Sequence, residues 1–276
     1  MKELLNRTIS GIVYASLFLL SLESKIAFIS LIFVFGIICN IEFSRLVNQK
    51  RTISHIIFTC LYVYFTYFEY TLISNSFFNE SKEILLVFSI FVLIFLIRDL
   101  FVKKNLPRFL SKNYIASTFY LSSSFVFIAL IPIELANKSF NPGIILGVFV
   151  LAWINDSFAF IIGKNFGKQK LFESVSPNKT IEGFFGGLFF TCLVSYVISY
   201  FTETSLTNSN WLLIAIIVSI FGTIGDLVES KYKRQAKVKD SGIILPGHGG
   251  LLDRLDSIIL ASPFIYLFLI FLDYVS

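Results

Sequence analysis

Residues 257–275, SIILASPFIYLFLIFLDYV, decide the kind of fold, because they form an apolar run close to the length of a bilayer-crossing helix. Such a helix needs roughly 20 predominantly apolar residues. Further runs of this kind precede it at roughly 10–22, 26–43, 55–73, 84–101, 114–133, 143–162, 183–201 and 211–228. The sequence therefore predicts an all-α, polytopic integral membrane helix bundle with about nine transmembrane helices.

The composition agrees with a membrane protein. Of 276 residues, 55% are hydrophobic, 15% are charged and 33 are phenylalanine, and the mean hydropathy is +0.78. The net charge of +5 follows from basic inner loops beside anionic lipids and gives no case for nucleic acid. The cysteines lie in apolar spans without metal-ligand spacing, so we expect packed thiols.

The basic residues predict the orientation, because cytoplasmic loops retain Lys and Arg. With the N-terminus inside, all but three of the 23 bases lie in inner segments, and the exceptions are Lys25, Lys82 and Lys138. Only residues 23–25 separate the first two spans, and we predict a hairpin there because one long helix would bury Lys25. We expect an N-terminal transmembrane region at 1–142 (about five helices) and a catalytic region at 143–276 (about four helices). The catalytic region would carry cytoplasmic active-site loops at 163–182 and 229–256.

Acidic residues crowd residues 225–257, GDLVESKYKRQAKVKDSGIILPGHGGLLDRLDS. Asp226 ends one span, and Asp253 and Asp256 share a face at the start of the next. Their repulsion favours a cation, so we predict that these three residues bind Mg²⁺, with Asp240 as a weaker ligand. Helix capping is the alternative for Asp253 and Asp256, and a Glu229–Lys233 salt bridge is the alternative for that part of the helix.

The same stretch carries bases and a constrained turn. We predict that Lys233, Arg234, Lys239 and Arg254 hold phosphates, although a solvated basic loop also explains them. In PGHGG, the backbone N–H groups of Gly249 and Gly250 can approach an anion closely. His248 is a candidate for proton transfer, and a turn hydrogen bond explains it equally well.

A second loop, GKNFGKQKLFESVSPNKTIEGFFGG from residue 163, repeats the theme. We expect Ser176 to cap a helix that starts at Pro177, with Lys179 and Thr180 in its first turn as an anion-binding start. The GKNFGK segment is not a Walker motif, because its spacing is short and no Ser or Thr follows. Asp156 is an intramembrane acid with either a structural partner or a place in the reaction cavity, and the Gly183/Gly187 spacing favours helix packing.

The run from Ser230 to Asp256, SKYKRQAKVKDSGIILPGHGGLLDRLD, closely resembles the motif of the phosphatidate cytidylyltransferase, or CDP-diacylglycerol synthase, family. KR, KD, PGHGG and DRLD follow in the family's order and spacing. SPNKTIEGFFGG, the Asp156 region, the RTISGIVYA opening and IEFSRL after the second span also look like that family. Tyr232 departs from it, because the family more often has an aliphatic residue or Phe there.

The resemblance implies condensation of CTP with phosphatidic acid to CDP-diacylglycerol and pyrophosphate, with Mg²⁺ and a candidate second cation. It also implies a homodimer in the bilayer, which we expect to be a bacterial inner membrane with the active site on the cytoplasmic side. Other CTP-dependent membrane lipid enzymes remain open, namely a polyprenol or dolichol kinase or an ether-lipid cytidylyltransferase. An ion-coupled transporter is disfavoured, because its acids are expected near mid-bilayer.

Overall fold

The computed structural model describes residues 2–71, 76–102, 113–134, 139–242 and 249–275. The chain forms two compact units. The first joins Met1–Leu130 to Tyr232–Leu255, and the second joins Ile131–Lys231 to Asp256–Ser276. Residues of the predicted loop 229–256 therefore belong to both units. The division into an N-terminal region at 1–142 and a catalytic region at 143–276 stays a prediction.

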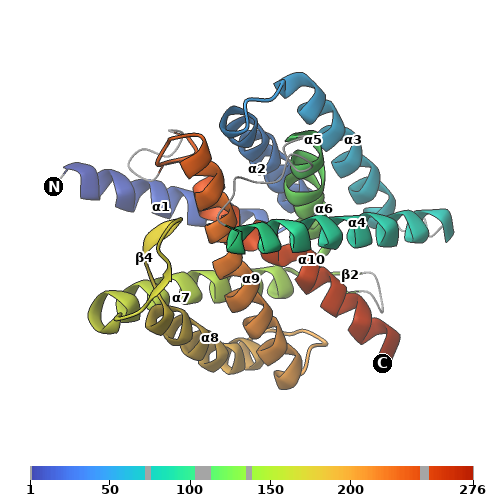
Figure 1. The fold of residues 1–276 in the computed structure, drawn as a ribbon. Helices are drawn as coiled ribbons and strands as arrows, with labels where there is room; N and C mark the ends of the chain where they lie inside the picture. Colours follow the sequence, from blue (N-terminus) through green and yellow to red (C-terminus); the bar gives the residue numbers. More distant parts are fainter. Residues whose placement is uncertain (1, 72–75, 103–112, 135–138, 243–248, 276) are drawn as a thin grey trace. The chain divides into compact units, whose positions relative to one another are not determined.

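The first unit is built from helices α1 to α6 with the π-helical segment η1 (Figure 1). Their bounds are α1 Lys2–Ser21, α2 Lys25–Leu46, α3 Arg51–Tyr70, α4 Ser76–Phe101, α5 Asn113–Ala116, η1 Ser117–Ser122 and α6 Ser123–Leu130. The last three follow one another without a break, so they act as a single rod.

The hairpin predicted between the first two spans is confirmed. Helix α1 ends at Ser21 and α2 begins at Lys25. Ser24 caps α2, because its hydroxyl accepts a hydrogen bond from the backbone N–H of Ala27 at 3.1 Å. Such a cap stabilises a helix by about 1 kcal/mol.

Helix α2 is held to its neighbours by close packing and by buried polar groups. A Cβ at Gly36 would collide with the ring of Phe58 in α3, so only glycine allows this approach. The Ser54 hydroxyl donates to Asn40 Oδ1 at 2.5 Å, and Asn40 Nδ2 donates to Ser122 Oγ at 3.4 Å. These bonds link the C-terminal half of α2 to α3 and η1.

The second unit contains two short hairpins and the remaining helices. The strands β1 (Ile133–Glu134) and β2 (Ser139–Phe140) pair antiparallel, as do β3 (Lys170–Phe172) and β4 (Ser176–Thr180). The helices are α7 Pro142–Phe166, α8 Ile181–Phe201, α9 Asn208–Gln235 and α10 Leu252–Val275. Helices α9 and α10 each have one end in the first unit.

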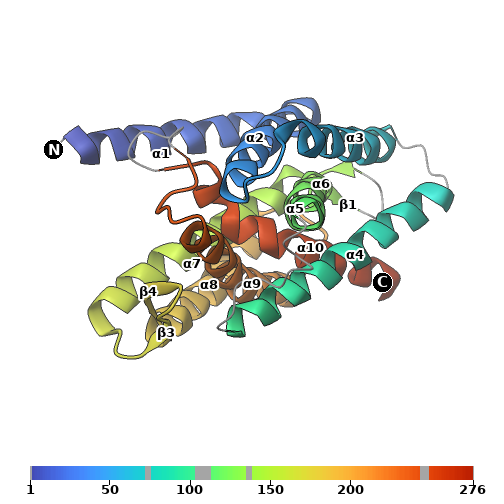
Figure 2. The ribbon, with the colours of Figure 1, turned by 45° about the horizontal axis from the view of Figure 1, so that its top comes forward.

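Helices α7 and α8 pack antiparallel along a row of glycines, with the β3–β4 hairpin where the chain passes from one to the other (Figure 2). A Cβ at Gly183 would lie 2.7 Å from the backbone oxygen of Ala159, and one at Gly187 would lie 2.8 Å from that of Asn155. Both approaches are too close for a side chain. The GxxxG spacing therefore serves helix packing, as predicted.

The all-helical membrane bundle predicted from the sequence is confirmed. In the part of the chain that the structure describes, six helices are long and apolar enough to cross a membrane, namely Lys25–Leu46, Phe77–Phe101, Pro142–Phe166, Ile181–Phe201, Asn208–Gln235 and Leu252–Val275. Shorter apolar helices cover Ile9–Ser21 and Tyr114–Leu130. With α3, these elements coincide with the predicted runs, so the chain is an integral membrane protein.

The helical start predicted at Ser176 is wrong. Residues Ser176–Thr180 form strand β4, and α8 begins at Ile181. Thr180 is the N-cap, and its hydroxyl accepts from the N–H of Gly183 at 3.1 Å. In addition, the Glu182 carboxylate accepts from the backbone N–H of Lys168 at 3.0 Å and so closes the hairpin against the helix. Both Ser176 and Thr180 are capping types, and Thr180 is the one that directly precedes the apolar run.

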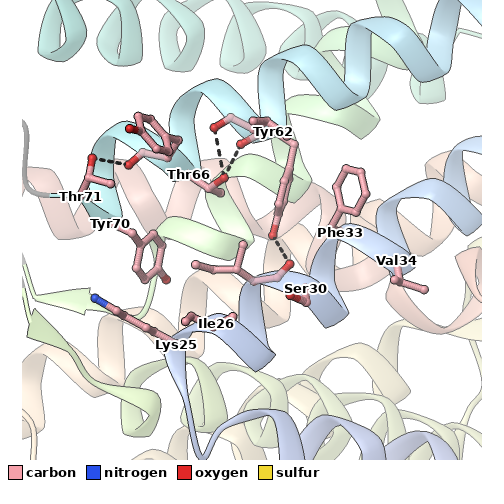
Figure 3. A pocket seen from close by; sticks show the side chains of 12 residues that line it. Lys25, Ile26, Ser30, Phe33, Val34, Tyr62, Thr66, Tyr70 and Thr71 are labelled. Carbon is pink, nitrogen blue, oxygen red and sulfur yellow. Dashed lines mark hydrogen bonds between the residues drawn. The ribbon is translucent and has the colours of Figure 1, made fainter.

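An open cavity of about 580 Å³ lies between α2 and α3 (Figure 3). Its walls are mostly apolar, and its lining includes Lys25, Phe33, Tyr62 and Tyr70. The Tyr62 hydroxyl donates to the backbone oxygen of Ile29 at 2.8 Å. On α2 this cavity is lined by residues from Lys25 to Val34, so it lies at least about 18 Å along the helix from Leu46.

Candidate active site

In the second unit, the β3–β4 hairpin brings a predicted phosphate ligand to a predicted metal ligand. The ammonium of Lys179 in β4 lies 2.5 Å from Oδ2 of Asp226 in α9, and the two side chains are 26% and 31% exposed. Ser230, one turn further along α9, donates to Asp226 Oδ1 at 3.3 Å. Both carboxylate oxygens of Asp226 therefore have a partner, and one partner is a cation.

Two glycines let α9 approach the start of α10 beside Asp226. A Cβ at Gly225 would lie 2.5 Å from the backbone oxygen of Asp256 and 3.0 Å from Cβ of Leu260. One at Gly222 would lie 3.4 Å from Cβ of Ser257. The backbone of Asp256 is thus in contact with the residue that precedes Asp226, as expected for antiparallel spans. The Asp256 side chain is buried, and its Oδ1 accepts from the N–H of Ser257 at 2.8 Å.

In the first unit, Asp253 pairs with Lys233. The Lys233 ammonium lies 2.6 Å from Asp253 Oδ1, and the side chains are 13% and 8% exposed. Tyr232, beside it, packs its ring edge-on against Phe43 at 5.1 Å between centroids. Lys233 thus forms an ion pair with the first turn of α10.

The second oxygen of Asp253 binds the loop before α10, which is represented here by Ser241, Gly242 and the segment from Gly249 to Leu251. Asp253 Oδ2 accepts from the N–H of Ser241 at 2.9 Å, from the Ser241 hydroxyl at 2.9 Å and from the N–H of Gly250 at 2.8 Å. Gly249 has a φ of +86°, and a Cβ there would lie 2.8 Å from Asp253 Oδ2. Only glycine suits this position. The capping alternative for Asp253 thus gains support, because its carboxylate does bind backbone N–H groups at the start of α10.

Glu42, which was not predicted from the sequence, binds the same segment at Ser241, Leu251 and Leu252. Glu42 lies near the C-terminal end of α2 and is 0% exposed. Its Oε1 accepts from the N–H of Leu251 at 3.2 Å, and its Oε2 accepts from the N–H of Leu252 at 2.8 Å and from the Ser241 hydroxyl at 3.3 Å. An ionisable residue within an apolar span is a functional candidate by default, so IEFSRL carried a signal that could have identified Glu42.

The other predicted residues are placed as follows. Arg234, Lys239, Asp240 and Arg254 are exposed. Ser176 is half-buried in β4, where it pairs with Phe172. Asp156 is exposed on α7. His248 lies outside the described residues.

Two of the predicted carboxylates, Asp253 in the first unit and Asp226 in the second, each form an ion pair with a lysine ammonium. Among the residues that the structure describes, no group of three or more His, Cys, Asp or Glu side chains is arranged to hold a metal ion. The carboxylates do suit cations, because each already stabilises one. The lysines suit phosphate oxygens, because an ammonium that can leave a carboxylate offers three donors.

Comparison with known proteins agrees with the motif. A phosphatidate cytidylyltransferase from Staphylococcus haemolyticus is 49% identical over 135 residues, which cover 49% of this chain and 52% of the relative. The proteins of that name from Staphylococcus epidermidis and Staphylococcus aureus are 49% and 48% identical over 126 residues, 46% of this chain and 48% of each relative. The matched part thus spans about half the length of these relatives. The model of the cytidylyltransferase family matches residues 5–272, and the chain therefore belongs to the cytidylyltransferase family.

Proposed function

We propose that this chain transfers the cytidylyl group of CTP to phosphatidic acid, giving CDP-diacylglycerol and pyrophosphate. The observation that carries the proposal is the family membership over residues 5–272. The names of the staphylococcal relatives, phosphatidate cytidylyltransferase, support the same substrate pair. The paired acids and bases at the C-terminal end of α9 and the start of α10 would supply the chemistry that two anionic substrates require.

The reaction needs no covalent enzyme intermediate. A phosphate oxygen of phosphatidate attacks the α-phosphorus of CTP, and the bond from that phosphorus to the oxygen of the β-phosphate breaks. The electron pair leaves with pyrophosphate. The protein therefore has to bring two anions together in line and neutralise the charge that develops on the leaving group.

We propose that Mg²⁺ is the cofactor, with ligands drawn from Asp226, Asp253, Asp256 and Asp240. The donor chemistry fits, because Asp226 and Asp253 each bind an ammonium now and carboxylate oxygens are the ligands that Mg²⁺ prefers. When bound, the ion would neutralise phosphate charge. A second cation belongs to the same proposal.

The bases would then hold phosphates. Lys179 and Lys233 would exchange their carboxylate partners for phosphate oxygens, which are anionic acceptors of the same kind. Arg234, Lys239 and Arg254 are exposed near the same helix ends in the chain and would extend this contact. Ser176 and Thr180 would act through the hairpin that carries Lys179. The backbone N–H of Gly249 would face an anion, whereas that of Gly250 donates to Asp253 Oδ2 at 2.8 Å and would have to exchange this carboxylate for a phosphate oxygen. We assign proton transfer to His248.

The proposal places the site on the cytoplasmic side of a bacterial inner membrane. It is supported by the concentration of basic residues in the segments predicted to lie inside and by the bacterial origin of the relatives. CTP and phosphatidic acid in the bilayer would be the partners, and a homodimer the assembly.

One assay tests the function. The purified protein in detergent micelles is offered CTP, dCTP or ATP with either phosphatidate or a polyprenol, and pyrophosphate and lipid product are both measured. We expect pyrophosphate and CDP-diacylglycerol in equal amounts from CTP and phosphatidate. Release of CDP with a phosphorylated polyprenol would instead identify a kinase, and absence of any nucleotide turnover would refute the proposal.

A further inference from the structure

We infer that Glu42 is a positioning residue for the proposed reaction, because it holds the loop that presents Asp253. The inference rests on the proposed function, and it adds to the site a residue of the N-terminal helices. It concerns the first unit alone, in which Glu42, the loop and Asp253 all lie.

The Glu42 carboxylate is enclosed by the loop. It is 0% exposed, and it accepts hydrogen bonds from the N–H groups of Leu251 and Leu252 and from the Ser241 hydroxyl at 2.8 to 3.3 Å. Two of these donors belong to the backbone at the start of α10. The carboxylate thus serves as the acceptor for N–H groups that have no acceptor within the helix.

Two glycines bring the loop into this contact. A Cβ at Gly250 would lie 2.6 Å from Glu42 Oε2, and a Cβ at Gly242 would meet Oε1 of the same carboxylate. Neither approach leaves room for a side chain. Gly242 and Gly250 are therefore required for the same reason, because each lies in close contact with the buried Glu42 carboxylate.

The hydrogen bonds continue from Glu42 to Asp253. The Ser241 hydroxyl lies 3.3 Å from Glu42 Oε2 and 2.9 Å from Asp253 Oδ2. Gly250, whose neighbour Leu251 donates to Glu42, donates to Asp253 Oδ2 at 2.8 Å. A shift of the loop away from Glu42 would therefore move the donors that fix the Asp253 carboxylate.

Glutamate is the side chain that this position requires. Both of its oxygens face donors, so an amide in its place would turn one acceptor into a donor that opposes an N–H group. An acid near the end of an apolar span costs less than the roughly 2.5 to 3.5 kcal/mol that insertion scales give at a helix centre, but its burial is still unfavourable. A purely structural cap would not need that charge, because a neutral acceptor or a serine cap serves most helices.

The test compares Glu42→Gln with Glu42→Asp and with a matched control. The control is Glu69→Gln, because Glu69 is also a buried acid of the first unit and lies 2.7 Å from the Lys82 ammonium with its side chain 2% exposed. Three quantities are measured in detergent: kcat and KM for CTP, the midpoint of thermal unfolding, and hydrogen exchange of peptides that cover residues 249–255.

We expect Glu42→Gln to lower kcat by about 10²-fold, the loss typical of a misplaced catalytic group, with little change in KM. Exchange at Leu251 and Leu252 should accelerate by about tenfold or more, because one of their two acceptor oxygens is replaced by an NH₂ group that opposes an N–H donor. Glu42→Asp keeps both oxygens and should recover part of kcat. Glu69→Gln should lower the unfolding midpoint without changing kcat per folded molecule or exchange in the loop.

Unchanged exchange in Glu42→Gln would overturn the inference, and so would faster exchange with an unchanged kcat. A loss of kcat that merely follows the folded fraction, as in the control, would overturn it as well. If the unmodified protein makes no CDP-diacylglycerol, the proposed function fails, and the exchange data alone still decide whether Glu42 holds the loop.

Discussion

Replacing Lys233 by glutamine would leave the buried Asp253 carboxylate without its cation. The ammonium lies 2.6 Å from Asp253 Oδ1, and the two side chains are only 13% and 8% exposed. Asp253 Oδ2 would keep its bonds from Ser241 and Gly250. The change therefore acts on one oxygen of the Asp253 carboxylate, and its effect on stability can be calculated.

The attraction between the two charges at this distance is about 6 kcal/mol at an effective dielectric constant of about 20. Most of it offsets the desolvation of both groups, and removal of one partner typically costs about 3 to 5 kcal/mol. Glutamine still donates one hydrogen bond, so we expect Lys233→Gln to cost about 2 to 3 kcal/mol. For a chain of this size that lowers the unfolding midpoint by roughly 5 to 10 °C.

The double variant Lys233→Gln/Asp253→Asn separates stability from function. Its two amides can hydrogen-bond to each other without any charge, so we expect it to regain all but about 1 kcal/mol of the loss. CMP transfer should stay abolished in both single variants and in the double variant. Thermal unfolding in detergent, followed by circular dichroism, and labelled CTP incorporation into lipid measure the two effects.

Two results would refute this reasoning. If the double variant is as unstable as the sum of the single variants, the ion pair is not energetically coupled. If the double variant regains turnover, the charges of Lys233 and Asp253 serve stability alone.

Further changes test the rest of the site. Lys179→Ala, which removes the cation on Asp226, should mainly raise KM for an anionic substrate, and unchanged KM and kcat would exclude the hairpin from the site. Gly249→Ala should lower kcat and cost about 1 kcal/mol or more, because alanine at positive φ is strained and its Cβ would meet Asp253 Oδ2; wild-type kinetics would contradict this. Thr180→Ala should cost about 1 kcal/mol through loss of the N-cap, and Thr180→Ser should restore it, as unfolding midpoints would show.

The helices were predictable because each one carries its own signal. Apolar runs indicated where the helices lie, and the hairpin at Ser24 and Lys25 was predicted because one long helix would bury the Lys25 ammonium. Helix ends needed a second signal. The apolar run of α10 begins only at 257, because a polar first turn carries no apolar signal, but Asp253 and Asp256 had been placed at the start of this helix, which begins at Leu252.

The β3–β4 hairpin and the role of Glu42 could not be read in the same way. Short strands such as Ser176–Thr180 lack a periodic pattern, and the two capping candidates near Pro177 look alike in the sequence. The partners of Glu42 are 209 and 210 residues away along the chain, so only the folded arrangement identifies them. The pairing of Lys179 with Asp226 was missed for the same reason, although both residues had been selected.

The separation between Glu42 and Leu252 has a consequence for biosynthesis. A ribosome adds residues from the N-terminus at about 5 to 20 per second, so the acid on α2 enters the bilayer long before the loop it binds has been made. During that interval the Glu42 carboxylate has none of its three hydrogen-bond donors, Ser241, Leu251 and Leu252. The nascent chain would therefore be most vulnerable to quality-control proteases until α10 is inserted, and a variant that slows this late step would lower the amount of enzyme rather than its turnover.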